Sequence, residues 1–135
     1  MIRRFDDRVL LSGQIAPHKV AGLADLGVTM LVNNRPDGEE PGQPHAGEIE
    51  EAAQAAGIPY RFVPILRGIG PAEVTAMKEA MAEAGDGKML AFCRSGTRSA
   101  YAAALAQRSA GESAEDLQRK LDQAGFDPGP IAHLL

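Results

Sequence analysis

The fold is decided by the stretch KMLAFCRSGTRSAYAAALAQRS, residues 88–109. It opens with an apolar run of the kind that forms a buried strand, and it closes with small residues suited to a helix. The turn between them holds Gly96, whose backbone freedom suits a tight loop. This order predicts a strand at residues 88–93, a short loop and a helix at residues 97–109. Cys93, the only cysteine, falls at the carboxyl end of that strand.

The rest of the chain alternates apolar runs with segments of helical periodicity. We predict strands at residues 8–11, 28–33 and 60–65, further helices at residues 17–26, 45–56, 71–84 and 113–124, and a final turn or short helix. This alternation predicts an α/β fold with a parallel or mostly parallel sheet and helices on both faces. Ligands of such sheets bind beyond the carboxyl ends of the strands, where Cys93 lies.

Length and composition indicate one globular domain, which we place at residues 1–135, with 44% hydrophobic and 24% charged residues. No apolar stretch approaches the roughly 18 to 20 residues of a membrane span, and acidic residues stand where the apolar part of a signal peptide would begin. We therefore expect a cytoplasmic protein with no membrane partner. The 14 basic and 18 acidic residues form no basic stripe, which argues against a nucleic acid partner.

The loop after Cys93 has the composition of an anion site. Backbone N–H groups of residues 94–98 and the start of the following helix would surround the sulfur, and such an environment stabilises a thiolate. Arg98 adds a fork of donors suited to an oxyanion. A lone cysteine at a strand end is usually an inert core residue, but an inert thiol does not require Arg, Ser, Gly, Thr, Arg and Ser in succession. We therefore predict that Cys93 is a nucleophile.

Other polar residues are predicted to line the same edge of the sheet. Arg35 would bind an anionic substrate and Asp37 would orient it or act as acid or base, although both also fit an ordinary turn. Arg67 lies in a glycine-flanked loop, and Thr97 or Ser99 would either cap the helix or donate a hydrogen bond to the sulfur. The predicted catalytic residues are Cys93, Arg98 and Asp37, and the predicted anion-binding or substrate-binding residues are Arg35, Arg67, Arg94, Ser95, Gly96, Thr97 and Ser99.

No metal site or organic cofactor is predicted. His18, His45 and His133 do not have the short spacing of metal ligands. Glu39 and Glu40 lack the pattern of a calcium loop, so we interpret them as part of a solvated acidic face.

The string FCRSGTRS resembles the active-site loops of two families, the rhodaneses and the cysteine-dependent phosphatases. Tyrosine and dual-specificity phosphatases use a C-x5-R loop, wide enough for a tetrahedral phosphate, whereas rhodanese sulfurtransferases use C-x4-R around a single sulfur. The spacing from Cys93 to Arg98 is C-x4-R, and Ser99 stands where a phosphatase would place its arginine.

Four segments resemble the DUF442 family, the beta-lactamase-hydrolase-like domain, across nearly the whole chain: LLSGQI, VNNRPDGEEPGQP, AAQAAGIPYRFVPI and FCRSGTRS. The resemblance implies the three-layer architecture of the dual-specificity phosphatases, the cysteine phosphatase II-like fold. Members of this family occur alone or fused to persulfide dioxygenases, and they are described both as phosphatases and as sulfurtransferases. A separately encoded persulfide dioxygenase is therefore an expected partner.

Leaving-group chemistry favours sulfur over phosphate. A phosphatase of this type needs a general acid, usually an Asp in the loop where this chain has Leu66 and Arg67, and Asp37 is the best substitute. A thiolate leaving group needs little protonation. We therefore predict a sulfurtransferase that forms a persulfide on Cys93 and uses a small sulfane-sulfur donor and a thiol acceptor. The alternatives are a phosphatase with a phosphocysteine at Cys93 and a non-catalytic anion-binding module.

Overall fold

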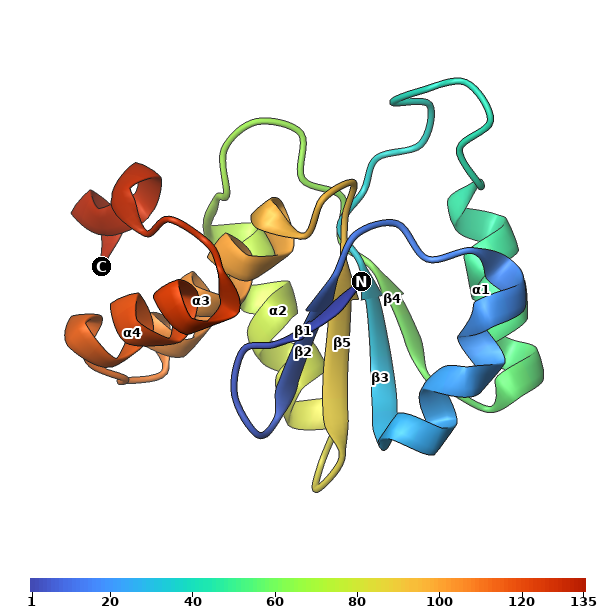
Figure 1. The fold of residues 1–135 in the computed structure, drawn as a ribbon, viewed down its shortest axis with the longest axis horizontal. Coiled ribbons are helices and arrows are strands. Elements are labelled where there is room, and N and C mark those ends of the chain that lie inside the picture. Colours follow the sequence, from blue (N-terminus) through green and yellow to red (C-terminus); the bar gives the residue numbers. More distant parts are fainter.

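The computed structural model describes residues 1–135 and is built around a five-stranded sheet (Figure 1). The strands are β1 (Ile2–Arg4), β2 (Val9–Ser12), β3 (Val28–Asn33), β4 (Tyr60–Phe62) and β5 (Lys88–Phe92). Their order across the sheet is β1-β2-β5-β3-β4. The last four strands in this order are mutually parallel, whereas β1 pairs antiparallel with β2. The prediction of a mostly parallel sheet is confirmed.

Helices cover both faces of the sheet. They are η1 (Pro17–Leu26), α1 (Ala46–Ala56), α2 (Pro71–Glu83), α3 (Thr97–Ser109), α4 (Ala114–Ala124) and η2 (Gly129–Leu134). Figure 1 shows η1 and α1 on the right of the sheet and α2, α3 and α4 on the left. The predicted three-layer architecture is therefore confirmed.

Successive residues of the central strands enter two separate cores. Val9 and Leu11 of β2 belong to the core beneath α2, α3 and α4, whereas Leu10 between them belongs to the core beneath η1 and α1. The same alternation places Ala91 of β5 in the first core and Phe92 in the second. Side chains of a strand point to opposite faces in turn, so a strand buried on both faces consists of consecutive apolar residues. This burial accounts for the unbroken apolar runs that predicted β2 and β5.

Three elements differ from the sequence-based expectation. Strand β1 was missed because its three residues are exposed and show no apolar pattern. Segment η1 is a 3₁₀ helix, in which the buried Val20 and Leu23 lie one three-residue turn apart. Strand β4 is three residues long rather than six, because Pro64 has no N–H to donate to the ladder.

The carboxyl ends of β2, β3, β4 and β5 meet at one edge of the sheet, at the top of Figure 1. The loops that follow these strands therefore converge there, including residues 34–45 and 93–96. None of the helices combines the length and apolarity that crossing a bilayer requires. The cytoplasmic location stays a prediction.

Candidate active site

Cys93 is the first residue after β5, and its side chain is fully buried at the edge of the sheet. Its backbone N–H donates to the carbonyl oxygen of Ser12 over 3.3 Å, which fixes the loop to the end of β2. The N–H of Gly96 points back at the sulfur, with 3.1 Å between the nitrogen and Sγ. The Gly96 N–H is therefore a hydrogen-bond donor to this sulfur.

Gly96 allows the chain to turn around the sulfur. Its φ of 95° lies in the left-handed region, where side chains are disfavoured. A Cβ atom at this position would lie 3.3 Å from the carbonyl oxygen of Ser12 and 3.3 Å from the ring of Phe126. Both the backbone conformation and the close packing therefore require glycine. Helix α3 begins at the next residue, so its N-terminus faces the same loop.

Arg98 lies in the first turn of α3 and reaches across the loop. Its NH1 group donates to the carbonyl oxygen of Ile65 over 2.8 Å. Both terminal nitrogens also donate to the carboxylate of Glu39, over 2.6 and 2.8 Å. The hydrogen bonds to Glu39 raise the pKa of Arg98, and the charge of the nearby Cys93 adds to this effect. Arg98 is therefore positioned by two loops and sits close to the sulfur.

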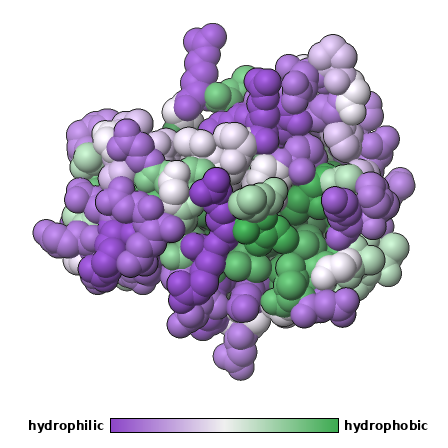
Figure 2. Space-filling model, viewed as in Figure 1, coloured by the Kyte–Doolittle hydropathy of each residue, from purple (hydrophilic) through white to green (hydrophobic).

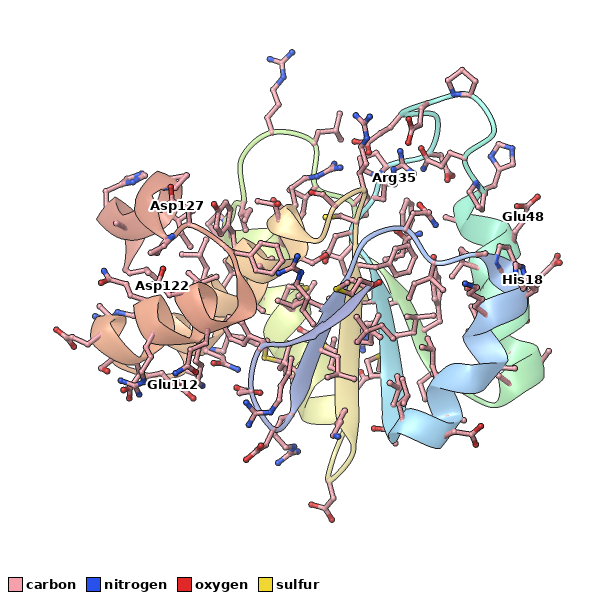
Figure 3. The ribbon with its side chains drawn as sticks, in the orientation of Figure 1. His18, Arg35, Glu48, Glu112, Asp122 and Asp127 are labelled. Atoms are coloured by element: carbon pink, nitrogen blue, oxygen red, sulfur yellow. The ribbon has the colours of Figure 1, made fainter.

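A second arginine holds Glu39 from the other side. Arg35 is only 2% exposed and lies beyond the upper ends of the strands in Figure 3. Its guanidinium donates to Glu39 over 2.9 Å, to Glu40 over 2.7 Å and to Gln14 over 3.0 Å. Hydrogen bonds from Arg98 and Arg35 lower the pKa of Glu39 to about 2. Glu39 is therefore ionised at neutral pH and is bound between two cations.

The family described as "Beta-lactamase hydrolase-like protein, phosphatase-like domain" matches residues 2–110. The chain belongs to this family. A beta-lactamase hydrolase-like protein of Xylella fastidiosa is 36% identical over 126 residues, which are 92% of this chain and 29% of that protein. One from Agrobacterium fabrum is 40% identical over 96 residues, which are 70% of this chain and 22% of that protein. The chain thus spans less than a third of the length of these curated relatives.

Solved structures share the fold of this phosphatase-like domain. A candidate phosphatase of Neisseria meningitidis superimposes with a TM-score of 0.80 at 25% identity, over 98% of this chain and 94% of that chain. A DUF442 protein of Shewanella putrefaciens gives 0.75 at 20% identity, over 98% and 82% of the two chains. PTPMT1 gives 0.73 at 16% identity, over 99% and 91%. The architecture is that of the dual-specificity and tyrosine phosphatases, as the resemblance implied.

The predicted hydroxyl ligands of the sulfur have other partners in this phosphatase-like domain. Ser99 is buried and donates to the Oδ1 atom of Asn34 over 2.8 Å. The Thr97 hydroxyl lies 3.1 Å from that of Ser95, and the Thr97 N–H points to the same Ser95 oxygen over 3.5 Å. Neither Thr97 nor Ser99 hydrogen-bonds to Cys93, so their predicted influence on the thiolate stays a prediction.

Asp37 stands apart from the arginines. Its Oδ1 atom accepts the N–H of Ala46 over 2.7 Å, which satisfies a free donor in the first turn of α1. It contacts neither Cys93 nor Arg98 by a hydrogen bond or ion pair. In the structure Asp37 therefore caps the first turn of α1, a contact that the sequence analysis did not foresee, and its role as acid or base stays a prediction.

The remaining predicted residues lie at the rim of the loop. Arg94 is 65% exposed on its side chain and pairs with Glu40 over 3.5 Å. Arg67 is exposed in the loop after β4, beside a groove of about 360 Å³ that also includes Thr97 and Arg98. No group of three or more His, Cys, Asp or Glu side chains is placed to hold a metal ion.

The sequence analysis missed Glu39, Glu40 and Gln14. Interpreting the two glutamates as a solvated acidic face was wrong for Glu39, whose side chain is 26% exposed and ion-paired with Arg35 and Arg98. The reason is topological, since Glu39 and Arg98 are 59 residues apart and meet only because parallel strands end at one edge. The sequence signal that could have revealed Glu39 is an acidic pair in the long loop that follows β3, because this loop lies at the carboxyl edge of the sheet.

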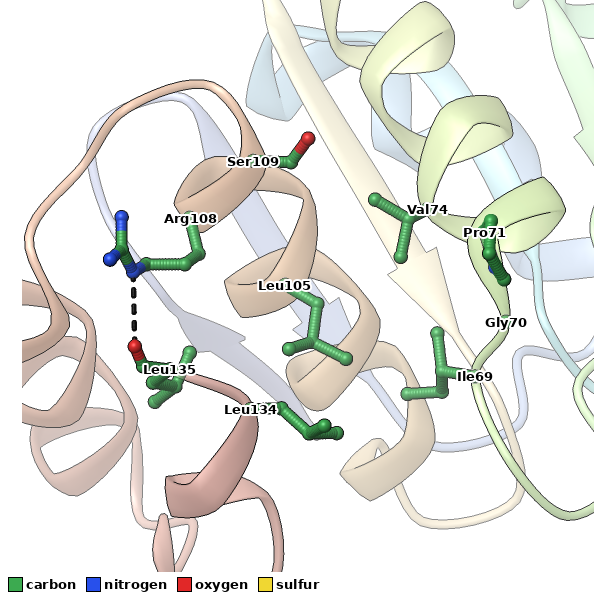
Figure 4. A pocket seen from close by; sticks show the side chains of 9 residues that line it. All are labelled: Ile69, Gly70, Pro71, Val74, Leu105, Arg108, Ser109, Leu134 and Leu135. Atoms are coloured by element: carbon green, nitrogen blue, oxygen red, sulfur yellow. Dashed lines mark hydrogen bonds between the residues drawn. The ribbon is translucent and has the colours of Figure 1, made fainter.

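Further hollows lie outside the loop, and the two larger ones are apolar. A groove of about 470 Å³ between α3, η2 and the start of α2 is lined by Ile69, Leu105, Leu134 and others. It also includes Arg108, which donates to the carbonyl oxygen of Leu135 (Figure 4). It shares these three apolar residues with the groove beside Arg98, so the two grooves are neighbours. Figure 2 shows a second apolar area where the sheet meets η1, with a groove of about 590 Å³ that includes neither Cys93 nor Arg98.

Proposed function

We propose that this domain transfers sulfane sulfur through a persulfide on Cys93. The observation that carries the proposal is the position of Asp37, the predicted acid, whose carboxylate accepts the N–H of Ala46 at the start of α1. The carboxylates of Glu39 and Glu40, in the loop that follows β3, are ion-paired with arginines, which lower their pKa values. The loop therefore has a nucleophile and cations but no carboxylic acid ready to protonate a leaving group.

Sulfur transfer fits this set of groups. The Cys93 thiolate attacks the outer sulfur of an organic persulfide, R–S–SH, and a new S–S bond forms between them. The S–S bond of the donor breaks, and its electron pair leaves with RS⁻, which needs no proton from the protein. The outer sulfur keeps its proton and stays on Cys93 as a persulfide. A second thiolate then attacks that sulfur, takes it as its own persulfide, and restores the Cys93 thiolate.

The loop supports each stage of this cycle. The N–H of Gly96 stabilises negative charge on the sulfur, and Arg98 contributes a nearby positive charge. The groove of about 360 Å³ beside Thr97 and Arg98 offers space for the organic part of a donor or an acceptor. A small persulfide donor, a thiol acceptor and a separately encoded persulfide dioxygenase remain part of the proposal.

A phosphatase is the second candidate, and the comparisons support it more directly than they support sulfur transfer. The family is described as phosphatase-like, and the structure from Neisseria meningitidis is of a candidate phosphatase. In that reaction Cys93 would attack phosphorus and form a phosphocysteine, and the leaving oxygen would require a proton. Binding of an anion without turnover is the third alternative.

A comparison of two reactions separates these candidates. Purified protein is assayed for transfer of sulfur from glutathione persulfide to a thiol and for release of phosphate from an aryl phosphate. We expect the first activity in the wild type and its loss in Cys93→Ser. Phosphate release that depends on Cys93, with no sulfur transfer, would overturn the proposal in favour of the phosphatase. If Cys93→Ser retains full sulfur transfer, Cys93 is not the carrier.

A further inference from the structure

The carboxylate of Glu39 is bound to the two terminal nitrogens of Arg98, which an oxyanion would otherwise contact. Two oxygens of the carboxylate accept from the two terminal nitrogens of Arg98, the bidentate arrangement with which arginine binds phosphate and sulfate. The remaining hydrogen bond of NH1 goes to the backbone oxygen of Ile65. An incoming oxyanion must therefore displace Glu39 before it can form the same pair.

Further hydrogen bonds hold Glu39 in this position. Arg35 donates to it from the buried side, where the guanidinium is only 2% exposed. The backbone N–H of Glu39 donates to the side chain of Gln43 over 3.0 Å, and Gln43 in turn donates to the carbonyl oxygen of Pro36 over 2.8 Å. Both the side chain and the backbone of Glu39 are thus fixed in the loop that follows β3.

The net charge of the cluster around Arg98 also disfavours binding of a divalent oxyanion. Arg35, Arg94 and Arg98 are the three cations of the cluster, and Glu39 and Glu40 are its two anions. One net positive charge remains, and an ionised Cys93 would cancel it. A divalent oxyanion would then meet a neutral cluster in which a carboxylate already pairs with Arg98, and like charges at close range repel.

We propose that Glu39 is a specificity-determining residue that keeps divalent oxyanions such as sulfate and phosphate off Arg98. A phosphatase would have to bind phosphate at this arginine, so this function agrees with sulfur transfer and not with the phosphatase alternative. The consequence for the sulfur donor rests on the sulfur transfer proposed above. Because thiosulfate is itself a divalent oxyanion, exclusion by Glu39 makes an organic persulfide a better donor than thiosulfate.

Calorimetric titration with inorganic sulfate tests the proposal without any assay of activity. The titration is performed near neutral pH on the wild type, Glu39→Gln and Glu40→Gln, with chloride used to keep ionic strength constant. Glu40→Gln is the matched control because it removes one negative charge from the same loop, while Glu40 does not contact Arg98. We expect Glu39→Gln to bind sulfate at least tenfold more tightly than the wild type, and Glu40→Gln to gain less than about threefold.

Two outcomes would overturn the proposal. Equal affinity in the wild type and Glu39→Gln would mean that Glu39 does not compete for Arg98. An equal gain in both variants would mean that only the overall charge of the loop matters. If Glu39→Gln does not fold, as judged by circular dichroism, Glu39→Ala replaces it. The wild type alone is also decisive, since a sulfate dissociation constant below about 1 mM would contradict exclusion.

Discussion

The buried hydroxyl of Ser99 donates to the Oδ1 atom of Asn34 over 2.8 Å, and this bond ties the first turn of α3 to the residue that follows β3. Asn34 completes the link by donating its Nδ2 hydrogen to the carbonyl oxygen of Val63 over 2.9 Å. The first turn of α3 and the segments that follow β3 and β4 are thus joined at one edge of the sheet. The position of Ser99 therefore indicates a role in fixing the geometry of the site.

Ser99→Ala should lower the free energy of unfolding by about 1 to 3 kcal/mol, because it leaves the buried oxygen of Asn34 without a donor. Chemical denaturation measures this change. Ser109→Ala, an exposed position on the same helix, is the control and should change stability by less than about 0.5 kcal/mol. Equal stability of the wild type and Ser99→Ala would show that the bond contributes nothing.

Gly96→Ala should reduce sulfur transfer at least tenfold. The new Cβ would press on Ser12 and Phe126, and relief of this contact would turn the Gly96 N–H away from the sulfur. Gly111→Ala controls for the backbone cost alone, since Gly111 also has a positive φ of 107° but has no atom within 4 Å of the added Cβ. The prediction fails if both variants lose stability equally and both retain activity.

Asp37→Asn should leave sulfur transfer within about threefold of the wild-type rate, because an amide oxygen can still accept the N–H of Ala46. Asp37→Ala should retain the activity but lower stability by about 0.5 to 2 kcal/mol, as expected for loss of a helix cap. Steady-state rates and denaturation curves measure both effects. A loss of about 100-fold or more in Asp37→Asn would instead identify a general acid.

Glu39 should make stability depend on acid pH. Its pKa in the folded protein is about 2, below the ordinary value of 4.5, so the unfolded chain binds a proton first as the pH falls. Its stabilising contribution is fully present above about pH 4.5 and is lost as the pH falls toward 2. After allowance for solvent screening, we expect Glu39→Gln to be about 1 to 2 kcal/mol less stable at neutral pH, with the difference vanishing near pH 2.

Denaturation curves across this pH range test the dependence on Glu39. Glu115→Gln, an exposed change on α4, controls for the removal of one negative charge. Parallel pH profiles for the wild type and Glu39→Gln would refute the role of this ion pair in stability.

Local patterns in the sequence were sufficient to predict most of the architecture. Strands β3 and β5 are buried on both faces and therefore appear as continuous apolar runs, and α4 begins where the sequence predicts a helix, with the Ser113 hydroxyl accepting the N–H of Asp116. Strand β1 could not be predicted in this way, because an exposed edge strand of three residues has no apolar pattern.

The site was predictable only where its residues are neighbours along the chain. The loop from Cys93 to Arg98 could be recognised from its own composition and spacing. The contact between Arg98 and Glu39 depends on the order of strands in the sheet, which brings the loops after β3 and β5 together. Asp37 fits a turn and a catalytic role equally well in the sequence, which gives no sign of its hydrogen bond with Ala46 at the start of α1.

The most direct test of the central claim is the intact mass of the protein after exposure to glutathione persulfide. The account predicts a gain of about one sulfur atom per chain, located on Cys93 and removed by a thiol acceptor, with no gain in Cys93→Ser. No adduct with any sulfane donor, together with a phosphocysteine at residue 93 after exposure to an aryl phosphate, would contradict it.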